Sequence, residues 1–306
     1  MHHFLDSLTA FGDRITDVNL RFAAAAMAVQ LVKTFAVARA WRSVLTAAYP
    51  AEEVRYLRIW GAYLIGAGTN ALLPLRGGDA VKVIAAKRQI PGSSYPAVAS
   101  SLVVLLIFDF VAASAFFAWA VSIGALPSVG LLHHRAFDLE WVLDHRLLSI
   151  AIGLLALGGG LVALSYAWGH VVRFSDHVIQ GLRTLRNFRH YLLHVVPWQA
   201  LDWCLRVTTV MLFLRAFGLP ATLHNAALAQ ITQDLSTALP FSPGGIGTAQ
   251  ALLLYLFRDV ASKTGTLAFS VGMQTMLLAV NLALGTLAAL ALGWRRHLAR
   301  LQEAEA

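Results

Sequence analysis

The sequence NALLPLRGGD, at residues 70–79, ends an apolar stretch that covers residues 59–75. Pro74 has no backbone N–H to donate, and its ring clashes with the preceding turn of a helix. Gly77 and Gly78 lose more conformational freedom than other residues when they enter a helix. A helix over the apolar residues is therefore predicted to break here, before a second helical piece.

The second half of the chain contains a matching stretch, ALPFSPGGIGTAQ, at residues 238–250. It ends the apolar residues 222–240, and a short helix is predicted to follow from Thr248 to about Phe257. Both stretches place Leu-Pro before Gly-Gly at the end of an apolar run. Matching breaks in two halves of a chain are typical of transporters with inverted repeats, whose broken helices meet near the bilayer midplane. The alternative is that proline and glycine only kink packed helices, as they often do in membranes.

A half-helix that begins after each Gly-Gly would direct unpaired N–H groups and a positive dipole end toward the membrane centre. Irregular backbone at that depth is tolerated only where protein or water satisfies it. Such an arrangement suits an anionic group, for example a lipid phosphate.

The rest of the chain predicts an all-α integral membrane protein. Of its 306 residues, 58% are hydrophobic and only 13% are charged, whereas soluble domains carry about 25% charged residues. Apolar runs of about 20 residues are long enough to cross the bilayer core. We expect one polytopic membrane domain over 1–306, with a first half at about 19–123 and a second at about 147–292. The predicted full spans are 19–40, 96–123, 147–168, 195–218 and 266–292.

The distribution of charge predicts the topology. The formal net charge is +8, but the arginines lie in short segments between apolar runs, as the positive-inside rule requires, and so favour membrane topology over nucleic-acid binding. Residues 170–192 read as a basic amphipathic helix in the membrane interface. With the basic segments in the cytoplasm and the acidic loop 124–145 outside, the chain makes about five full crossings and two re-entrant hairpins. The C-terminus is then cytoplasmic and the N-terminus outside.

Three segments resemble the lysylphosphatidylglycerol synthase transmembrane-region family, also called flippase-like domain proteins. NALLPLRGGDAVKV (70–83) is similar to the family's N-x-x-L-P-x-R-x-G-(D/E)-x-x-(R/K) segment. LPFSPGGIGTAQ (239–250) resembles its L-P-x-S-P-G-G-x-G-x-x-(E/Q) segment, and ARAWRSVL (38–45) its early R-W segment. The resemblance extends over roughly residues 19–292.

The resemblance implies a bacterial inner-membrane protein related to the lipid-translocating half of multiple peptide resistance factor. Relatives handle anionic or aminoacylated lipids, polyprenyl carriers or hopanoids, and no appended synthase domain is expected here. The chain departs from the family at Leu105-Leu106, where Glu-Arg is common before Asp109. It also has Gln250 in place of the acidic residue, and Gln274 near the position of a frequent arginine. These departures indicate that the substrate differs from that of better-known members.

The candidate substrate-binding residues cluster at the two breaks and in the apolar helices. Arg76 and Lys82 would bind phosphate or extend to the interface. Asp79 would cap the second helical piece or pair with Arg76, and Asn70 would satisfy broken backbone. Asp109 is an ionisable group in an apolar helix, and such groups are functional by default; it would pair with Arg76 or carry a proton. The full set is Asn70, Arg76, Gly77, Gly78, Asp79, Lys82, Asp109, Asp234, Ser242, Pro243, Gly244, Gly245, Gly247 and Gln250.

Two charged residues four positions apart, Asp202 and Arg206, are expected to neutralise each other. The histidines His190 and His194 have the same spacing, but no carboxylate or cysteine completes a metal set. No metal or cofactor is predicted, and no catalytic motif is found.

Three hypotheses for the function follow. The first is translocation of a membrane lipid or lipid-linked carrier, with an anionic head group held near the breaks. The second is an intramembrane enzyme acting on a prenyl- or hopanoid-type lipid, for which Asp109 and Asp234 are the only obvious pair. The third is a non-transporting partner of an envelope lipid-synthesis enzyme.

Overall fold

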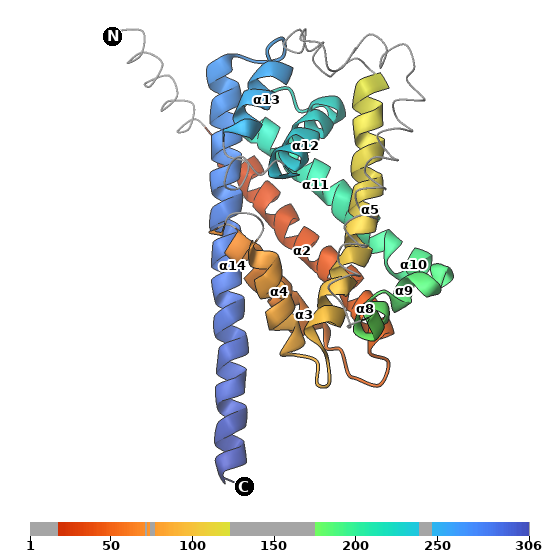
Figure 1. The fold of residues 1–306 in the computed structure, drawn as a ribbon. Helices are drawn as coiled ribbons and strands as arrows, with labels where there is room; N and C mark the ends of the chain where they lie inside the picture. The colour runs from red at the N-terminus through yellow and green to blue at the C-terminus, as the bar shows by residue number, and fades with distance from the viewer. Residues whose placement is uncertain (1–17, 71, 74–76, 123–174, 239–246, 306) are drawn as a thin grey trace.

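The computed structural model describes residues 18–70, 72–73, 77–122, 175–238 and 247–305 (Figure 1). All regular secondary structure in these residues is α-helical, which confirms the all-α part of the predicted fold class; the five full spans and the two re-entrant hairpins stay predictions. Three of the described helices are long and apolar enough to cross a membrane: Leu20–Ala48, Tyr95–Phe116 and Lys263–Gly293. The predicted loop 124–145 and span 147–168 lie outside the described residues.

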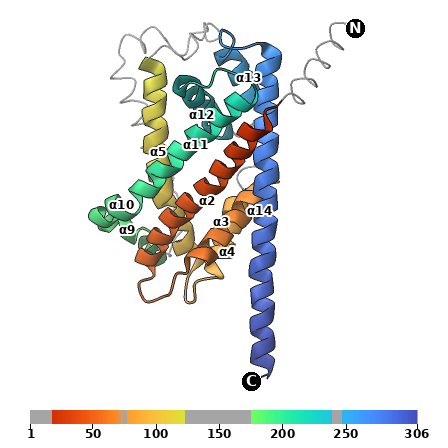
Figure 2. The ribbon, with the colours of Figure 1, turned by 180° about the vertical axis from the view of Figure 1, so that it is seen from behind.

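Two neighbouring helices, α2 (Leu20–Ala48) and α11 (Val196–Ala216), form the centre of the molecule. Figure 2 shows them side by side along most of their length. Helix α2 begins where the Asn19 side chain accepts a hydrogen bond from the Arg21 backbone N–H, at 3.1 Å, as an N-cap residue does. It continues past the predicted end at residue 40, because the apolar face that includes Trp41, Val44 and Leu45 is fully buried.

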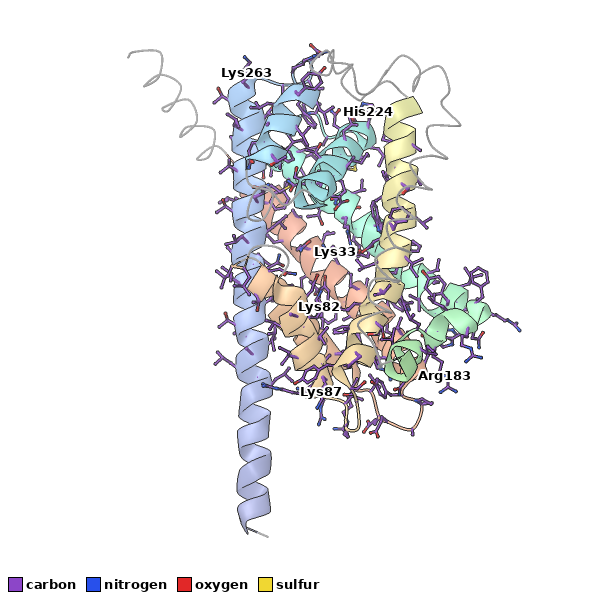
Figure 3. All side chains as sticks on the ribbon, in the orientation of Figure 1. Lys33, Lys82, Lys87, Arg183, His224 and Lys263 are labelled. Carbon is purple, nitrogen blue, oxygen red and sulfur yellow. The ribbon has the colours of Figure 1, made fainter. Side chains whose placement is uncertain are left out.

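The first predicted break separates α3 (Tyr56–Asn70) from α4 (Gly77–Lys87), and these helices pack against each other as a hairpin. Close packing depends on glycine. A Cβ atom at Gly78 would overlap the Gly66 carbonyl oxygen and the Asn70 backbone nitrogen. Lys87 lies at the lower end of the helix bundle in Figure 3, above the C-terminal end of α14, and Lys82 lies nearer the middle of the bundle. The broken end of the hairpin therefore points inward.

The second predicted break separates α12 (Leu223–Ala238) from α13 (Thr248–Leu256), which also contact each other. His224, at the start of α12, lies near the upper end of the molecule in Figure 3, as does Lys263. The pair α12 and α13 therefore lies toward the upper end of the helix bundle, and the pair α3 and α4 lies toward its lower end (Figure 1). Residues 71, 74–76 and 239–246 of the two breaks lie outside the described residues, so the re-entrant arrangement stays a prediction.

The long helix α14 (Lys263–Glu305) runs along one side of the molecule (Figure 1). It approaches α3 closely where Gly68 meets Gly285: a Cβ at Gly68 would lie 2.8 Å from the Asn281 carbonyl oxygen, and one at Gly285 would lie 2.9 Å from the Leu64 oxygen. Small residues at such crossings let membrane helices pack backbone against backbone.

The basic segment predicted as one helix over 170–192 is divided into three short helices. They are α8 (Ser175–Gly181), α9 (Arg183–Arg186) and α10 (Phe188–His194). Asn187 ends α9 and starts α10, because its side chain accepts a hydrogen bond from the His190 N–H at 3.1 Å. The segment packs on α2 and on α5 (Tyr95–Ser122).

The described core consists of two apolar clusters. The upper cluster joins the start of α2 to α11, α12, α13 and α14, and includes Ala26, Phe213, Leu214, Phe257 and Phe269. The lower cluster joins the end of α2 to α3, α4, α5 and α10, and includes Trp41, Leu45, Ile59, Val98 and Tyr191. Charged residues on α2, α5, α11 and α12 lie between the two clusters.

Candidate functional site

The guanidinium of Arg206 on α11 is surrounded by three carboxylates. Its Nε lies 2.7 Å from Asp202 Oδ2, its Nη2 lies 3.5 Å from Asp109 Oδ1, and its Nη1 lies 4.0 Å from Asp234 Oδ1. Asp202 is fully buried, whereas the Arg206 side chain is 20% exposed. Asp109 comes from α5 and Asp234 from α12, so one arginine joins three helices.

Neighbouring polar groups hold this arrangement. Trp203 Nε1 donates to Asp109 Oδ1 at 3.0 Å, and the Arg206 guanidinium lies 5.3 Å from the centre of the Trp203 ring. Gln230 Nε2 donates to Asp234 Oδ2 at 3.1 Å. The carboxylates at the edge of the cluster are therefore fixed by hydrogen bonds as well as by charge, which makes the geometry specific.

A second basic residue, Lys33 on α2, lies near the same carboxylates. Lys33 lies near the middle of the molecule in Figure 3 and interacts electrostatically with Asp202, Asp234 and Asp109. No salt bridge to Lys33 forms within the part of the chain that the structure describes. We call Lys33, Asp109, Asp202, Arg206 and Asp234 the polar layer.

The first hairpin carries a second ionic group. Lys82 Nζ lies 2.8 Å from Asp79 Oδ1, and Asn70 Nδ2 donates to the same oxygen at 3.2 Å. The Lys82 ammonium also lies 4.9 Å from the centre of the Tyr63 ring. Tyr63 interacts electrostatically with Asp79, with Asp109 and with Arg206. The hairpin group is thus adjacent to the polar layer.

Glutamines connect the second hairpin to α14. Gln250 Oε1 accepts from the Gly247 N–H at 2.5 Å, and Gln250 Nε2 donates to Gln274 Oε1 at 2.9 Å. Gln274 Nε2 donates in turn to Gln233 Oε1 at 3.4 Å. Gly247 has a φ of 92°, a left-handed conformation that favours glycine. This neutral chain of amides ties the start of α13 to α12 and α14.

Comparison with protein families matches residues 4–285 to the lysylphosphatidylglycerol synthase TM region. The chain belongs to this family. Neither curated proteins nor solved structures give a match. The resemblance that the three motifs predict is therefore confirmed over most of the chain.

Two positions at which this member of the lysylphosphatidylglycerol synthase TM region departs from the family motifs contact each other in the structure. Gln250, where the motif often has an acidic residue, pairs with Gln274, near the position of the frequent arginine. In this chain the two positions form a neutral amide pair, in which Gln250 Nε2 donates to Gln274 Oε1.

Some of the predicted substrate-binding residues lie close together in the structure. Asn70, Asp79 and Lys82 meet at the first hairpin, close to Gly77 and Gly78 at the start of α4. Asp79 lies in the first turn of α4 and binds Lys82 and Asn70. Asp109 and Asp234 meet at Arg206. Five predicted residues lie outside the described residues: Arg76, Ser242, Pro243, Gly244 and Gly245.

Five residues of the site were not predicted as binding residues: Lys33, Tyr63, Trp203, Asp202 and Arg206. Lys33 is the only charged residue between Arg21 and Arg39 of the first span, so its isolation was a usable signal. Tyr63 and Trp203 gave no comparable signal, because aromatic residues are common in membrane helices. Arg206 was predicted to pair with Asp202 alone, and the structure adds Asp109 and Asp234 as partners.

Proposed function

We propose that this protein moves a membrane lipid or lipid-linked carrier across the bacterial inner membrane, with a phosphate-bearing head group passing through the polar layer. The observation that carries the proposal is the placement of Lys33, Arg206 and three carboxylates between two apolar clusters. Charged groups inside a membrane domain are costly and mark substrate or ion pathways.

The cations of the site have different roles in this proposal. Arg206 is neutralised by its carboxylates and holds α5, α11 and α12 in register. Lys33, whose ammonium forms no salt bridge with a described residue, is the charge that meets the phosphate. Gly77 and Gly78 at the start of α4 add backbone N–H groups at a helix N-terminus, which favour anions. In the sequence, Arg76 directly precedes them.

The two hairpins supply the means of alternating exposure. The pair α3 and α4 and the pair α12 and α13 lie toward opposite ends of the helix bundle (Figure 1), which supports the comparison with transporters whose broken helices come from opposite faces of the membrane. Rocking of one half against the other would open the polar layer first to one side and then to the other. The acyl chains would remain in the bilayer, because only the head group requires a polar path.

The charges favour a cytoplasmic position for the lower end of the molecule. Lys87 and Arg183 lie there in Figure 3, and Arg88 directly follows Lys87 in the chain. By the positive-inside rule this end faces the cytoplasm, together with the C-terminal end of α14. The hairpin of α3 and α4 would then be re-entrant from the cytoplasm and that of α12 and α13 from outside.

The proposal is tested with purified protein in liposomes that contain a fluorescent anionic lipid or a fluorescent zwitterionic lipid. We expect the anionic lipid to cross faster than in protein-free liposomes and to be recovered with unchanged mass. A chemically altered lipid would favour an intramembrane enzyme, for which Asp109 and Asp234 beside Arg206 are the nearest pair of carboxylates. Neither movement nor alteration, with folded protein, would favour a partner of a lipid-synthesis enzyme.

A further inference from the structure

An open pocket of about 920 Å³ lies far from the polar layer, between the C-terminal end of α2 and the three short helices α8, α9 and α10. Arg183, which is labelled at the lower end of Figure 3, marks its position. The polar residues that line it are Gln180, Arg183, Thr184, Arg186, Asn187 and His190.

The walls of the pocket are fixed to the rest of the protein. Gln180 Nε2 donates to the Ala48 carbonyl oxygen at 3.1 Å, and Thr184 Oγ1 donates to the Val44 oxygen at 3.4 Å. Both hydrogen bonds attach the short helices to the last turns of α2. The pocket is therefore preorganised, which lowers the entropic cost of binding a ligand.

The pocket is cationic. Arg183 and Arg186 are three residues apart in α9, both are exposed, and neither forms a salt bridge with any described residue. Burial and the neighbouring His194 lower the pKa of His190 below its ordinary value. His190 is thus neutral at pH 7, and the two guanidinium groups supply the positive charge. Guanidinium groups bind phosphate through paired hydrogen bonds.

Apolar side chains project from the same segment. Ile179 is 50% exposed and also lines the pocket, and Phe188 and Leu193 are 65% and 60% exposed. A segment with arginines beside exposed aromatic and aliphatic side chains is typical of the membrane interface. Free phosphate would use the arginines alone, whereas a phospholipid would use both kinds of side chain.

We propose that this pocket binds the phosphate of an anionic membrane phospholipid, with its acyl chains over Ile179 and the exposed apolar side chains of α10. This lipid is not the transported molecule: it occupies a separate site and holds the short helices to α2 at the bilayer surface.

The test is thermal unfolding of the purified full-length protein in detergent, with increasing dioctanoyl phosphatidylglycerol. The ligand is expected to raise the melting temperature of the wild type in a saturable way. The double variant Arg183→Gln/Arg186→Gln should lower the apparent affinity about tenfold or more. The matched control is Arg189→Gln, because Arg189 is an exposed arginine of the same segment that does not line the pocket.

Further ligands distinguish binding of an anionic phospholipid from binding of free phosphate or of a zwitterionic lipid. Dioctanoyl phosphatidylcholine and inorganic phosphate at the same concentrations should give much weaker protection. Arg183→Lys/Arg186→Lys keeps the charge but not the paired hydrogen bonds, so its affinity should lie between those of the double Gln variant and the wild type, which separates lost charge from lost structure. Equal protection of the double Gln variant and the wild type, or an equal loss in Arg189→Gln, would overturn the proposal. The assay does not measure transport, so its outcome is independent of the proposed function.

Discussion

At the scale of residues, the site depends on one arginine. The planar guanidinium of Arg206 has donors that point in several directions, so it can meet carboxylates from three helices at once. Its shortest contact, 2.7 Å, is to Asp202, whose side chain is fully buried. Removing one partner of a buried pair leaves an uncompensated charge, and that penalty exceeds the value of the pair itself.

The substitution Asp202→Asn should therefore destabilise the protein strongly. We expect a loss of about 1.5–3 kcal/mol, because Arg206 loses its shortest charge-assisted hydrogen bond and keeps only the longer contacts to Asp109 and Asp234. Thermal unfolding in detergent measures the change as a clear drop in melting temperature. Asp259→Asn is the matched control, since Asp259 pairs with Arg258 on an exposed surface, and it should leave the melting temperature unchanged. Equal behaviour of the two variants would contradict the role given to Asp202.

The polar layer was only partly predictable from sequence. The four-residue spacing of Asp202 and Arg206 predicted their pairing, because residues four apart share a helix face. Asp109 was predicted as a site residue for its isolation in an apolar helix, and Asp234 for its place just before the second break. Their common partner depends on how α5 and α12 pack on α11. No local sequence pattern predicts that packing of helices.

At the scale of elements, the first hairpin is built by glycine. Gly66 and Gly78 allow α3 and α4 to approach closely, and this places Asp79 and Lys82 beside Asn70. The breaks were predicted because proline and glycine act locally on the backbone. The end of α2 was not predicted correctly. The helix extends past residue 40 because Trp41, Val44 and Leu45 are buried against neighbouring helices. The division of 170–192 depends on the Asn187 cap.

Replacing Gly78 by alanine should destabilise the hairpin. The added Cβ would overlap the backbone of Gly66 and Asn70, and overpacking of this kind costs about 1–3 kcal/mol. Gly293→Ala in α14 is the control, because a Cβ there meets nothing within 4 Å. Fluorescence-detected size-exclusion after heating should show a loss of folded Gly78→Ala at temperatures that leave Gly293→Ala intact. The same profile for both would show that α3 and α4 do not pack this closely.

At the scale of the whole molecule, the polar layer lies between the two apolar clusters. The pair α3 and α4 lies toward one end of the helix bundle and the pair α12 and α13 toward the other (Figure 1). The sequence predicted one helix break in each half, because the Leu-Pro and Gly-Gly pattern occurs once in each half. The position of Lys33 beside the carboxylates required the packing of α2 against α11.

The orientation of the molecule in the membrane gives a direct prediction. The variants are made in a Cys204→Ser background, which removes the only cysteine of the sequence. The Arg88→Cys variant should react with a membrane-impermeant maleimide only after the inner membrane has been permeabilised. The Lys263→Cys variant should react in spheroplasts, whose inner membrane is still intact, because residue 263 lies at the opposite end of the helix bundle. The reverse pattern of labelling would place the basic end outside and contradict the topology.

The most direct test of the central claim is the rate of anionic lipid movement in liposomes with Lys33→Met, which removes the charge and keeps a side chain of similar length. Lys263→Met is the control, because Lys263 is an exposed lysine at the upper end, away from the polar layer. We predict that Lys33→Met lowers the rate about tenfold or more while Lys263→Met matches the wild type, since a lost charge-assisted contact with phosphate costs about 1.5–3 kcal/mol. An unchanged rate in folded, reconstituted Lys33→Met would show that the head group does not pass through the polar layer.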